Sequence, residues 1–416
     1  MRGIYDFSGC CFRLYSLRHP VGSPDIITKD EGMGRVFIWA DEYYPVIGGL
    51  ELALHKTALS LTSSGIQVVV VTPEDGLDRS QLGYKVVYMD PAHWLQESGT
   101  WLRAQSNEKD LVYIARLFRK FERPQLEIMR TIRGFRLLRL PSTWGSRRYS
   151  KLDSIIFSVT DAFIALNSLT YAAITRRFPG KEVHLCYNWA APLDVGMCAR
   201  RSGFCYAGRL ARSKNIQQLM HAWKNVGFGK TQSLTLFADP RQIGIVMQEL
   251  EGAGTNSNIL LSAPYHPNSY EALARFLFLV LPSYREGCPN ILVEAYALGV
   301  PVIGSEIPGI AEHALAVGAP IIRLPLSSDS IQQALCEANS LSPNQYSQLR
   351  QRVREYYEDH FRREMVAPVI VQYLSRLSVD VAHRRTETRQ ASARAKRTYF
   401  VTPVARVLRG KREVLS

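Results

Sequence analysis

Two acidic side chains, Glu286 and Glu294, lie in the segment SYREGCPNILVEAYALGVPVI, residues 283–303. Paired carboxylates can act as a general acid and base, or they can accept hydrogen bonds from hydroxyl groups such as a ribose diol. We favour the second role because Glu294 would lie about one turn into a helix, where nothing obvious raises its pKa. An ordinary helical glutamate near a helix N-terminus is an equal alternative for Glu294. Glu286, in a loop with glycine and proline, is the stronger candidate.

Loop, helix, turn and strand follow one another in this segment. A buried strand is expected at residues 278–281, and Pro289 suits the first helical position, where its missing N–H costs nothing. Gly299 ends the helix, and residues 300–303 begin the next strand. Free N–H groups at such a helix start can hold a phosphorylated, hydroxyl-rich ligand. No base is placed to activate Cys288, so a buried cysteine is favoured over a nucleophile.

A second loop with charged residues follows the strand expected at residues 204–207. It holds Gly208, Arg209 and Lys214, and Asn215 is expected to cap the next helix. A guanidinium and an ammonium beside two helix N-termini could bind a diphosphate and stabilise it as a leaving group. Taken alone, an arginine and a lysine in a loop are more often surface residues.

The first half of the chain starts a comparable unit. Residues 35–40 are expected to form a strand, which is followed by Gly48 and Gly49, a helix over 50–61 and a strand over 68–72. Strand, glycine loop, helix and strand in this order begin a parallel, doubly wound sheet. The two glycines would let the backbone approach a ligand at the carboxyl end of the first strand. The dipeptide alone more often marks a simple turn.

The remaining elements alternate in the same way and predict an α/β protein. Further strands are expected at 85–89, 136–140, 162–166, 183–187, 234–237, 259–261 and 321–324. Helices are expected at 111–121, 170–178, 216–223, 245–250, 270–276, 331–338, 345–357 and 363–377.

The pattern divides the chain into two lobes. The predicted first lobe is 33–190, the hinge 191–203 and the second lobe 204–357. A closing helix at 358–380 is expected to pack back toward the first lobe, and 381–416 is a basic tail.

Composition and length limit the class of protein. The chain has 416 residues, enough for two cores, and no run approaches the roughly eighteen apolar residues of a membrane-spanning helix. Seven scattered cysteines without metal spacing favour a reducing cytoplasm and no metal site. Residues 1–32 lack the pattern of a signal peptide, and we hypothesise that Met33 is the native start. Mass spectrometry of the natural N-terminus tests this.

Much of the net charge of +14 lies in the tail, where ten basic residues face two acidic ones between residues 384 and 413. Such a tail suits anionic lipid or nucleic acid, and a solvated disordered end is at least as probable. Four basic residues of the first lobe could also hold the protein at an anionic membrane surface: Arg116, Arg119, Lys120 and Arg123.

The segment from Glu286 to Glu294 resembles the Glu-x7-Glu signature of the retaining GT-B glycosyltransferases, and is most similar to glycosyltransferase family 4. The Gly208-to-Lys214 loop resembles the diphosphate-binding loop of that family, and the Gly48-Gly49 unit resembles its amino-terminal glycine loop. The resemblance implies two Rossmann-like lobes facing a cleft. It also implies transfer of a hexosyl group from a nucleotide diphosphate sugar, with retention and without a metal ion or other cofactor.

The resemblance also implies roles for individual residues. Arg209 and Lys214 would hold the diphosphate, Glu294 the ribose diol, and Gly48 and Gly49 would let the first lobe close on the phosphate. Glu286 and the backbone of the following five residues would contact the donor sugar and phosphate: Gly287, Cys288, Pro289, Asn290 and Ile291.

The first lobe departs from the family pattern. Two histidines usual in many members are not evident at 121–129 and 138–145, and Ser142 and Thr143 stand where the second is expected. The alternative function is therefore a degenerate protein that binds a sugar nucleotide or a partner protein without turnover. Nucleic-acid binding by the tail is a third hypothesis, disfavoured because no nucleic-acid motif is present. The expected acceptor is a glycan or a lipid-linked sugar.

Overall fold

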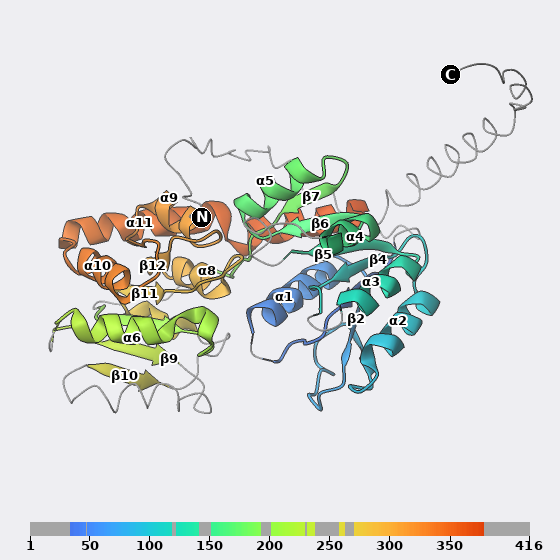
Figure 1. The fold of residues 1–416 in the computed structure, drawn as a ribbon, viewed down its shortest axis with the longest axis horizontal. Coiled ribbons are helices and arrows are strands. Elements are labelled where there is room, and N and C mark those ends of the chain that lie inside the picture. The colour runs from blue at the N-terminus through green and yellow to red at the C-terminus, as the bar shows by residue number, and fades with distance from the viewer. Residues whose placement is uncertain are drawn as a thin grey trace, which may run out of the picture. The chain divides into compact units, whose positions relative to one another are not determined.

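The computed structural model describes residues 34–46, 48–118, 122–140, 151–192, 201–228, 231–237, 258–262 and 270–377 (Figure 1). For residues 122, 151–153, 270 and 271 it describes the backbone only. The leader, the basic tail and the helix expected at 245–250 lie outside this set. So do most of the hinge, Arg119, Lys120, Ser142 and Thr143.

Seven parallel strands form the sheet of the first half. They are β1 (Val36–Trp39), β2 (Val68–Pro73), β3 (Lys85–Met89), β4 (Leu111–Ile114), β5 (Phe135–Arg139), β6 (Ala162–Ala165) and β7 (Glu182–Leu185). Their order is β3-β2-β1-β4-β5-β6-β7, so the sheet grows outward in both directions from β1. The carboxyl ends of β1 and β4 therefore meet where the order reverses, which is the usual ligand crevice of such sheets.

Both faces of this sheet are covered by helices, because side chains along each strand alternate between the faces. Val36 and Ile38 of β1 join the apolar cluster that includes α1 (Gly49–Ser63). Phe37 and Trp39 join the opposite cluster. Four helices contribute to that second cluster: α2 (Trp94–Gln105), α3 (Glu122–Thr131), α4 (Lys151–Val159) and α5 (Ser168–Arg177).

The helix expected at 111–121 is wrong at its start, where the chain forms β4. Val112 and Ile114 are β-branched, and all four residues of β4 are buried between two neighbouring strands. The basic residues that suggested an amphipathic helix come only after the strand. Arg116, one of them, pairs with Asp41 at 2.8 Å and with Glu42 at 3.2 Å. Its charge is thus already neutralised within the lobe.

Six parallel strands form the second sheet, in the order β10-β9-β8-β11-β12-β13. They are β8 (Phe204–Ala207), β9 (Leu234–Phe237), β10 (Ile259–Ser262), β11 (Phe278–Leu281), β12 (Val302–Ser305) and β13 (Ile321–Ile322). This order repeats that of the first sheet up to its sixth strand, and both agree with the doubly wound pattern predicted from the sequence. The segment expected as a helix at 270–276 is the 3-10 helix η4 (Tyr270–Arg275).

Helices of the second half pack around this sheet and against one another (Figure 1). They are α6 (Ile216–Asn225), α8 (Asn290–Ala297), α9 (Ala311–Val317), α10 (Ser328–Asn339) and α11 (Pro343–His360). α6 contacts α10, while α11 contacts both α8 and α9. Among the helices that the structure describes, none is both long enough and apolar enough to cross a bilayer.

The chain returns to the first sheet after α11, through a helix at residues 363–377. Tyr373 stacks on His184 of β7, with ring centroids 4.2 Å apart, and Arg376 pairs with Glu182 of the same strand. A bridge between Ala190 and Arg362 fixes the start of this return. The two sheets thus share one continuous apolar cluster within residues 33–416.

His313 on α9 is fully buried and makes stability depend on pH. Its Nδ1 lies 3.0 Å from the Tyr356 hydroxyl, and its ring packs against Tyr187 and Phe361. Burial, aided by the charge of His360, lowers the pKa of His313 to about 3. An unfolded histidine has a pKa of about 6.5, so between these values the unfolded chain takes up a proton that the folded chain does not.

The folded state should therefore lose stability as the pH falls from about 6.5 toward 3. His313→Gln is expected to reduce this slope by up to about 1.4 kcal/mol per pH unit. Urea unfolding of the wild type and the variant between pH 7.5 and 5 measures both slopes. Equal slopes would show that His313 does not contribute.

Candidate active site

The two charged loops predicted from the sequence are in direct contact. Lys214, at the end of η2 (Arg212–Lys214), forms an ion pair with Glu286, and the Tyr284 N–H donates to the Ser213 carbonyl at 2.8 Å. The Lys214 side chain is 25% exposed and that of Glu286 is 13% exposed, so both remain partly open to solvent. The pair joins the loop after β8 to the loop after β11, at the carboxyl edge of neighbouring strands.

Gly208 and Arg209 form the turn that leads from β8 to this ion pair. Gly208 has a φ of 151°, and a Cβ there would lie 3.0 Å from the Tyr206 hydroxyl. That hydroxyl donates to the Arg209 carbonyl at 2.9 Å, which fixes the turn. The Arg209 side chain is exposed. The structure therefore places Arg209 on the loop that leads to Lys214, with its side chain open to solvent.

Asn215 precedes α6 as expected, but its side chain does not cap the helix. Asn215 has a left-handed φ of 58°, and its side chain makes no capping hydrogen bond to α6. It donates instead to the Leu326 carbonyl at 3.3 Å. Asparagine tolerates this backbone region better than most residues, so Asn215 supports the sharp turn between η2 and α6 rather than the helix start.

The start of α8 meets the glycine loop of the first half. Pro289 is the N-cap residue, one position earlier than predicted, and α8 begins at Asn290. The Asn290 side chain donates to the Gly49 carbonyl at 2.6 Å. The N–H groups of Asn290 and Ile291 belong to the first turn, where no intrahelical acceptor exists. They are available for an anionic ligand at the helix N-terminus.

Gly48 lets the Glu51 side chain lie directly against the backbone of the glycine loop. A Cβ at this position would overlap the carboxylate of Glu51, which is 1% exposed and lies in the first turn of α1. Burial raises the pKa of Glu51, and the neighbouring Glu42 carboxylate adds to the rise. Gly48 thus packs against α1, while the carbonyl of Gly49 accepts the hydrogen bond from Asn290.

Glu294 is buried, with 2% of its side chain exposed, and faces a cation from the first half. The Lys56 ammonium on α1 lies 3.7 Å from the Glu294 carboxylate and donates to the Trp189 carbonyl at 3.0 Å. Burial lowers the pKa of Lys56, and the charge of Glu294 opposes that shift. A ribose diol that binds Glu294 would therefore compete with Lys56 for the carboxylate.

Replacement of Glu294 by alanine is expected to weaken binding of the nucleotide-sugar donor about 10-fold or more, because hydrogen bonds to a charged group contribute about 1.5–3 kcal/mol. Isothermal titration calorimetry measures the change. Lys56→Met is the matched control, since it breaks the same ion pair and leaves the carboxylate. We expect that control to keep its donor affinity within about threefold. Unchanged affinity in Glu294→Ala would remove this residue from the ribose site.

Cys288 is a buried residue that holds the loop in place. Its Sγ accepts from the Asn188 N–H at 3.4 Å, and the Asn188 side chain donates to the Cys288 carbonyl at 2.5 Å. Burial raises the pKa of the Cys288 thiol well above its usual range. It is therefore a poor nucleophile, as expected from the sequence.

Gly287 packs against the first half of the chain on two sides. A Cβ on Gly287 would lie 2.8 Å from the Leu166 side chain, and the Asn167 side chain donates to the Gly287 carbonyl at 3.4 Å. The same carbonyl faces Gly309, where any Cβ would overlap it. Position 287 thus needs a residue without a side chain.

Sequence reasoning missed several residues that the fold brings to this site. Lys56 lies about two turns along α1 from Gly49, on the same helix face at a spacing of seven, which is a helical signal that was available. Glu312 follows a turn after β12 and accepts from the Ser168 N–H at 3.0 Å. Contacts such as this one join segments far apart in sequence and leave no local pattern.

The site can bind a phosphorylated, hydroxyl-rich ligand. It offers an ammonium, the free N–H groups of a helix start and two carboxylates, and its one thiol is buried. Among the described residues, no three His, Cys, Asp or Glu side chains are grouped so as to hold a metal ion.

Residues 201–338 match the family described as Glycosyl transferases group 1. A protein of Bacillus subtilis (strain 168) named as a teichuronic acid biosynthesis glycosyltransferase, TuaC, is 32% identical over 140 residues. The match spans 32% of this chain and 32% of that protein, so it covers about a third of the relative's length. Both comparisons concern a part of the chain.

Solved structures resemble a much larger share of this chain than these two sequence matches cover. HepE of Anabaena, in complex with UDP and glucose, has a TM-score of 0.65 at 14% identity and covers 82% of this chain and 99% of its own. A mutant of S. aureus TarM, in complex with fondaparinux, alpha-GlcNAc-glycerol and UDP, has a TM-score of 0.67 at 10% identity. It covers 83% of this chain and 100% of its own. The likeness establishes the GT-B fold that the sequence predicted.

Proposed function

We propose that this protein is a glycosyltransferase that moves a hexosyl group from a UDP-sugar to a glycan or a lipid-linked acceptor. Transfer proceeds with retention and without a metal ion, as in family 4. The observation that carries the proposal is the convergence of three loops on the start of α8. Lys214 and Glu286 join two of them, and the Gly49–Asn290 contact adds the third.

Each part of the convergence has a role in this proposal. The diphosphate lies on the free N–H groups at the start of α8, next to Lys214 and Arg209, which stabilise its charge as it leaves. Glu294 accepts from the ribose diol, and Glu286 with the backbone of residues 287–291 contacts the sugar. The departing phosphate takes the proton of the acceptor hydroxyl, so that no protein base is required.

Support for the donor and the acceptor comes from the relatives. HepE and the TarM mutant were both solved with UDP, and the TarM complex also holds glycan-like ligands. The name of TuaC refers to the biosynthesis of teichuronic acid. We therefore place this protein on the cytoplasmic side, at or near an anionic membrane. Pairing of Arg116 with Asp41 reduces the basic surface on which the membrane contact was based.

A thermal-shift screen tests the proposal, because a ligand that binds only the folded state raises the melting temperature. UDP, GDP, ADP and their glucose conjugates are the probes, followed by a transfer assay with and without EDTA. We expect stabilisation by UDP and turnover that EDTA does not reduce. Binding without hydrolysis or transfer would favour the degenerate alternative, which the missing histidines motivated.

A further inference from the structure

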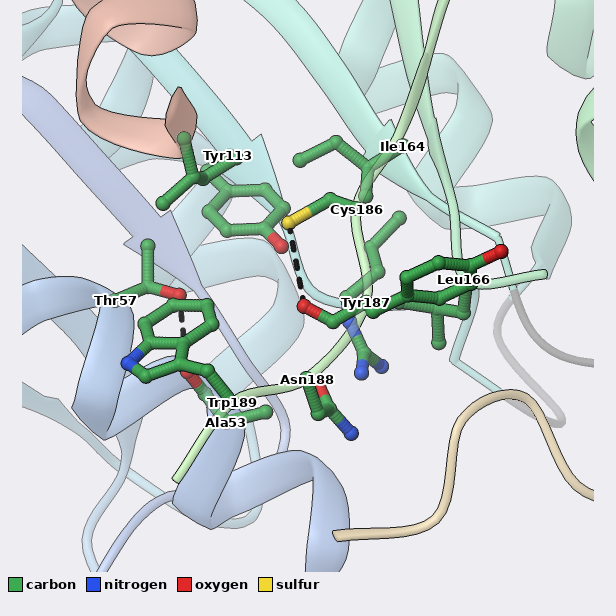
Figure 2. Close-up of a pocket in the computed structure, with 11 residues that line it drawn as sticks. Ala53, Thr57, Tyr113, Ile164, Leu166, Cys186, Tyr187, Asn188 and Trp189 are labelled. Carbon is green, nitrogen blue, oxygen red and sulfur yellow. Dashed lines mark hydrogen bonds between the residues drawn. The ribbon is translucent and has the colours of Figure 1, made fainter. Parts of the chain in front are cut away.

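Arg139 ends β5 in the first half of the chain, and only 9% of it is exposed. It lines a pocket with side chains from β4, β6 and the segment after β7. Figure 2 shows Tyr113, Cys186, Tyr187 and Asn188 around that pocket. The space at its centre holds no more than about one water molecule. Only the tip of a ligand, such as the oxygens of an acidic group, can therefore reach Arg139.

The positive charge of Arg139 has no carboxylate beside it within the described residues, and its guanidinium makes no hydrogen bond to them. Four other arginines of this lobe each pair with a carboxylate at 2.6–3.0 Å: Arg35, Arg79, Arg116 and Arg136. Arg136 lies on the same strand as Arg139, so the contrast is local. Arginine cannot shed its proton, and a buried charge without a partner is destabilising.

The pocket of Arg139 adjoins the loop that is proposed to contact the donor. Tyr113 and Asn188 line this pocket with Arg139, and the Asn188 side chain donates to the Cys288 carbonyl at 2.5 Å. Cys288 belongs to the 286–291 loop, whereas Tyr113 belongs to β4 of the first sheet. Arg139 therefore lies in a pocket at the carboxyl ends of the first-sheet strands, and Asn188 of that pocket contacts the loop.

We propose that Arg139 binds an anionic group, a carboxylate or a phosphate, on the ligand that this protein uses. The group belongs either to the transferred sugar or to the acceptor, and the inference rests on the proposed function. A planar guanidinium matches both anions through two parallel hydrogen bonds. Ligand binding would supply the counter-charge that the free protein lacks, so Arg139 selects acidic sugars or acidic acceptors over neutral ones.

Calorimetry with matched probes tests the proposal on the full chain. UDP-glucuronic acid is compared with UDP-glucose for a carboxylate on the donor. With UDP present, glycerol 3-phosphate is compared with glycerol for a phosphate on the acceptor. We expect the wild type to prefer one acidic probe by about 10- to 100-fold, the usual range for charged hydrogen bonds. Arg139→Met should abolish that preference, Arg139→Lys should keep part of it, and Arg123→Gln, an exposed charge of the same lobe, should keep all of it.

The melting temperature of Arg139→Met without ligand supplies a second test. Removal of an unpaired buried charge should raise the Tm of Arg139→Met by about 2 °C or more, whereas loss of a structural contact would lower it. A lower Tm, or a wild type that binds UDP and prefers neither acidic probe, would overturn the assignment of Arg139. Absence of UDP binding in the wild type would instead refute the proposed donor and this inference with it. UDP affinity should be equal in the wild type and in Arg139→Met.

Discussion

Replacement of Lys214 by methionine is expected to lower the rate of sugar transfer by about 100-fold or more. Loss of one preorganised donor to developing negative charge has a cost of this order, and the departing diphosphate carries such charge. Among the residues that the structure describes, Lys214 is the lysine paired with Glu286, four residues before the start of α8. Methionine keeps most of the side-chain length, so packing in η2 should change little.

Two variants separate this effect from a loss of structure. Arg212→Met removes an exposed charge from the same 3-10 turn and should leave the rate within about twofold. Glu286→Gln removes the negative charge that pairs with Lys214 but keeps the shape of the side chain. It tests whether the ion pair or the ammonium alone matters. Steady-state transfer from UDP-glucose gives the rates, and circular dichroism checks the fold. A Lys214→Met rate close to that of Arg212→Met would exclude the role in leaving-group stabilisation.

Much of the fold could be predicted because parallel strands bury both faces. Val68 to Val71 form a continuous apolar run that has no helical periodicity, and the run is indeed β2. The same principle was available for β4, where Leu111 to Ile114 are all buried. The interpretation failed there because the basic residues that follow made the longer segment look amphipathic. Length should have decided between the two, since only the five residues from Leu111 to Ala115 are apolar in succession.

The parts of the site that lie within single loops and helix starts could be predicted from the sequence. Lys214 and Glu286 stand in separate loops, and their side chains suit one ligand, so their contact agrees with the prediction. The partner of Glu294 could not be foreseen, because Lys56 lies on α1 in the first half of the chain and the sequence separation is large. Arg139 was hidden for a related reason: only the absence of a nearby carboxylate distinguishes it from Arg136, and an absence of that kind is a property of the fold.

Gly309→Ala is expected to weaken UDP binding by about 100-fold and to lower the Tm by several degrees. Gly309 has a φ of 81°, and a Cβ there would overlap the Gly287 carbonyl and lie 3.0 Å from the Glu286 carbonyl. Those atoms are backbone, so the loop that holds Glu286 and the start of α8 must move to make room. A shift of this loop displaces the groups proposed to bind the sugar and the diphosphate.

Gly318→Ala is the matched control for this prediction. Gly318 has a similar φ of 71°, but the nearest atom to its Cβ would be the flexible end of Arg352 at 3.5 Å. Both substitutions share the strain of a left-handed alanine, about 1 kcal/mol, and only Gly309→Ala adds a backbone collision. We expect Gly318→Ala to lower the Tm slightly and to leave UDP affinity unchanged, as measured by thermal melts and calorimetry. Equal affinities in the two variants would mean that the position of the 286–291 loop does not control donor binding.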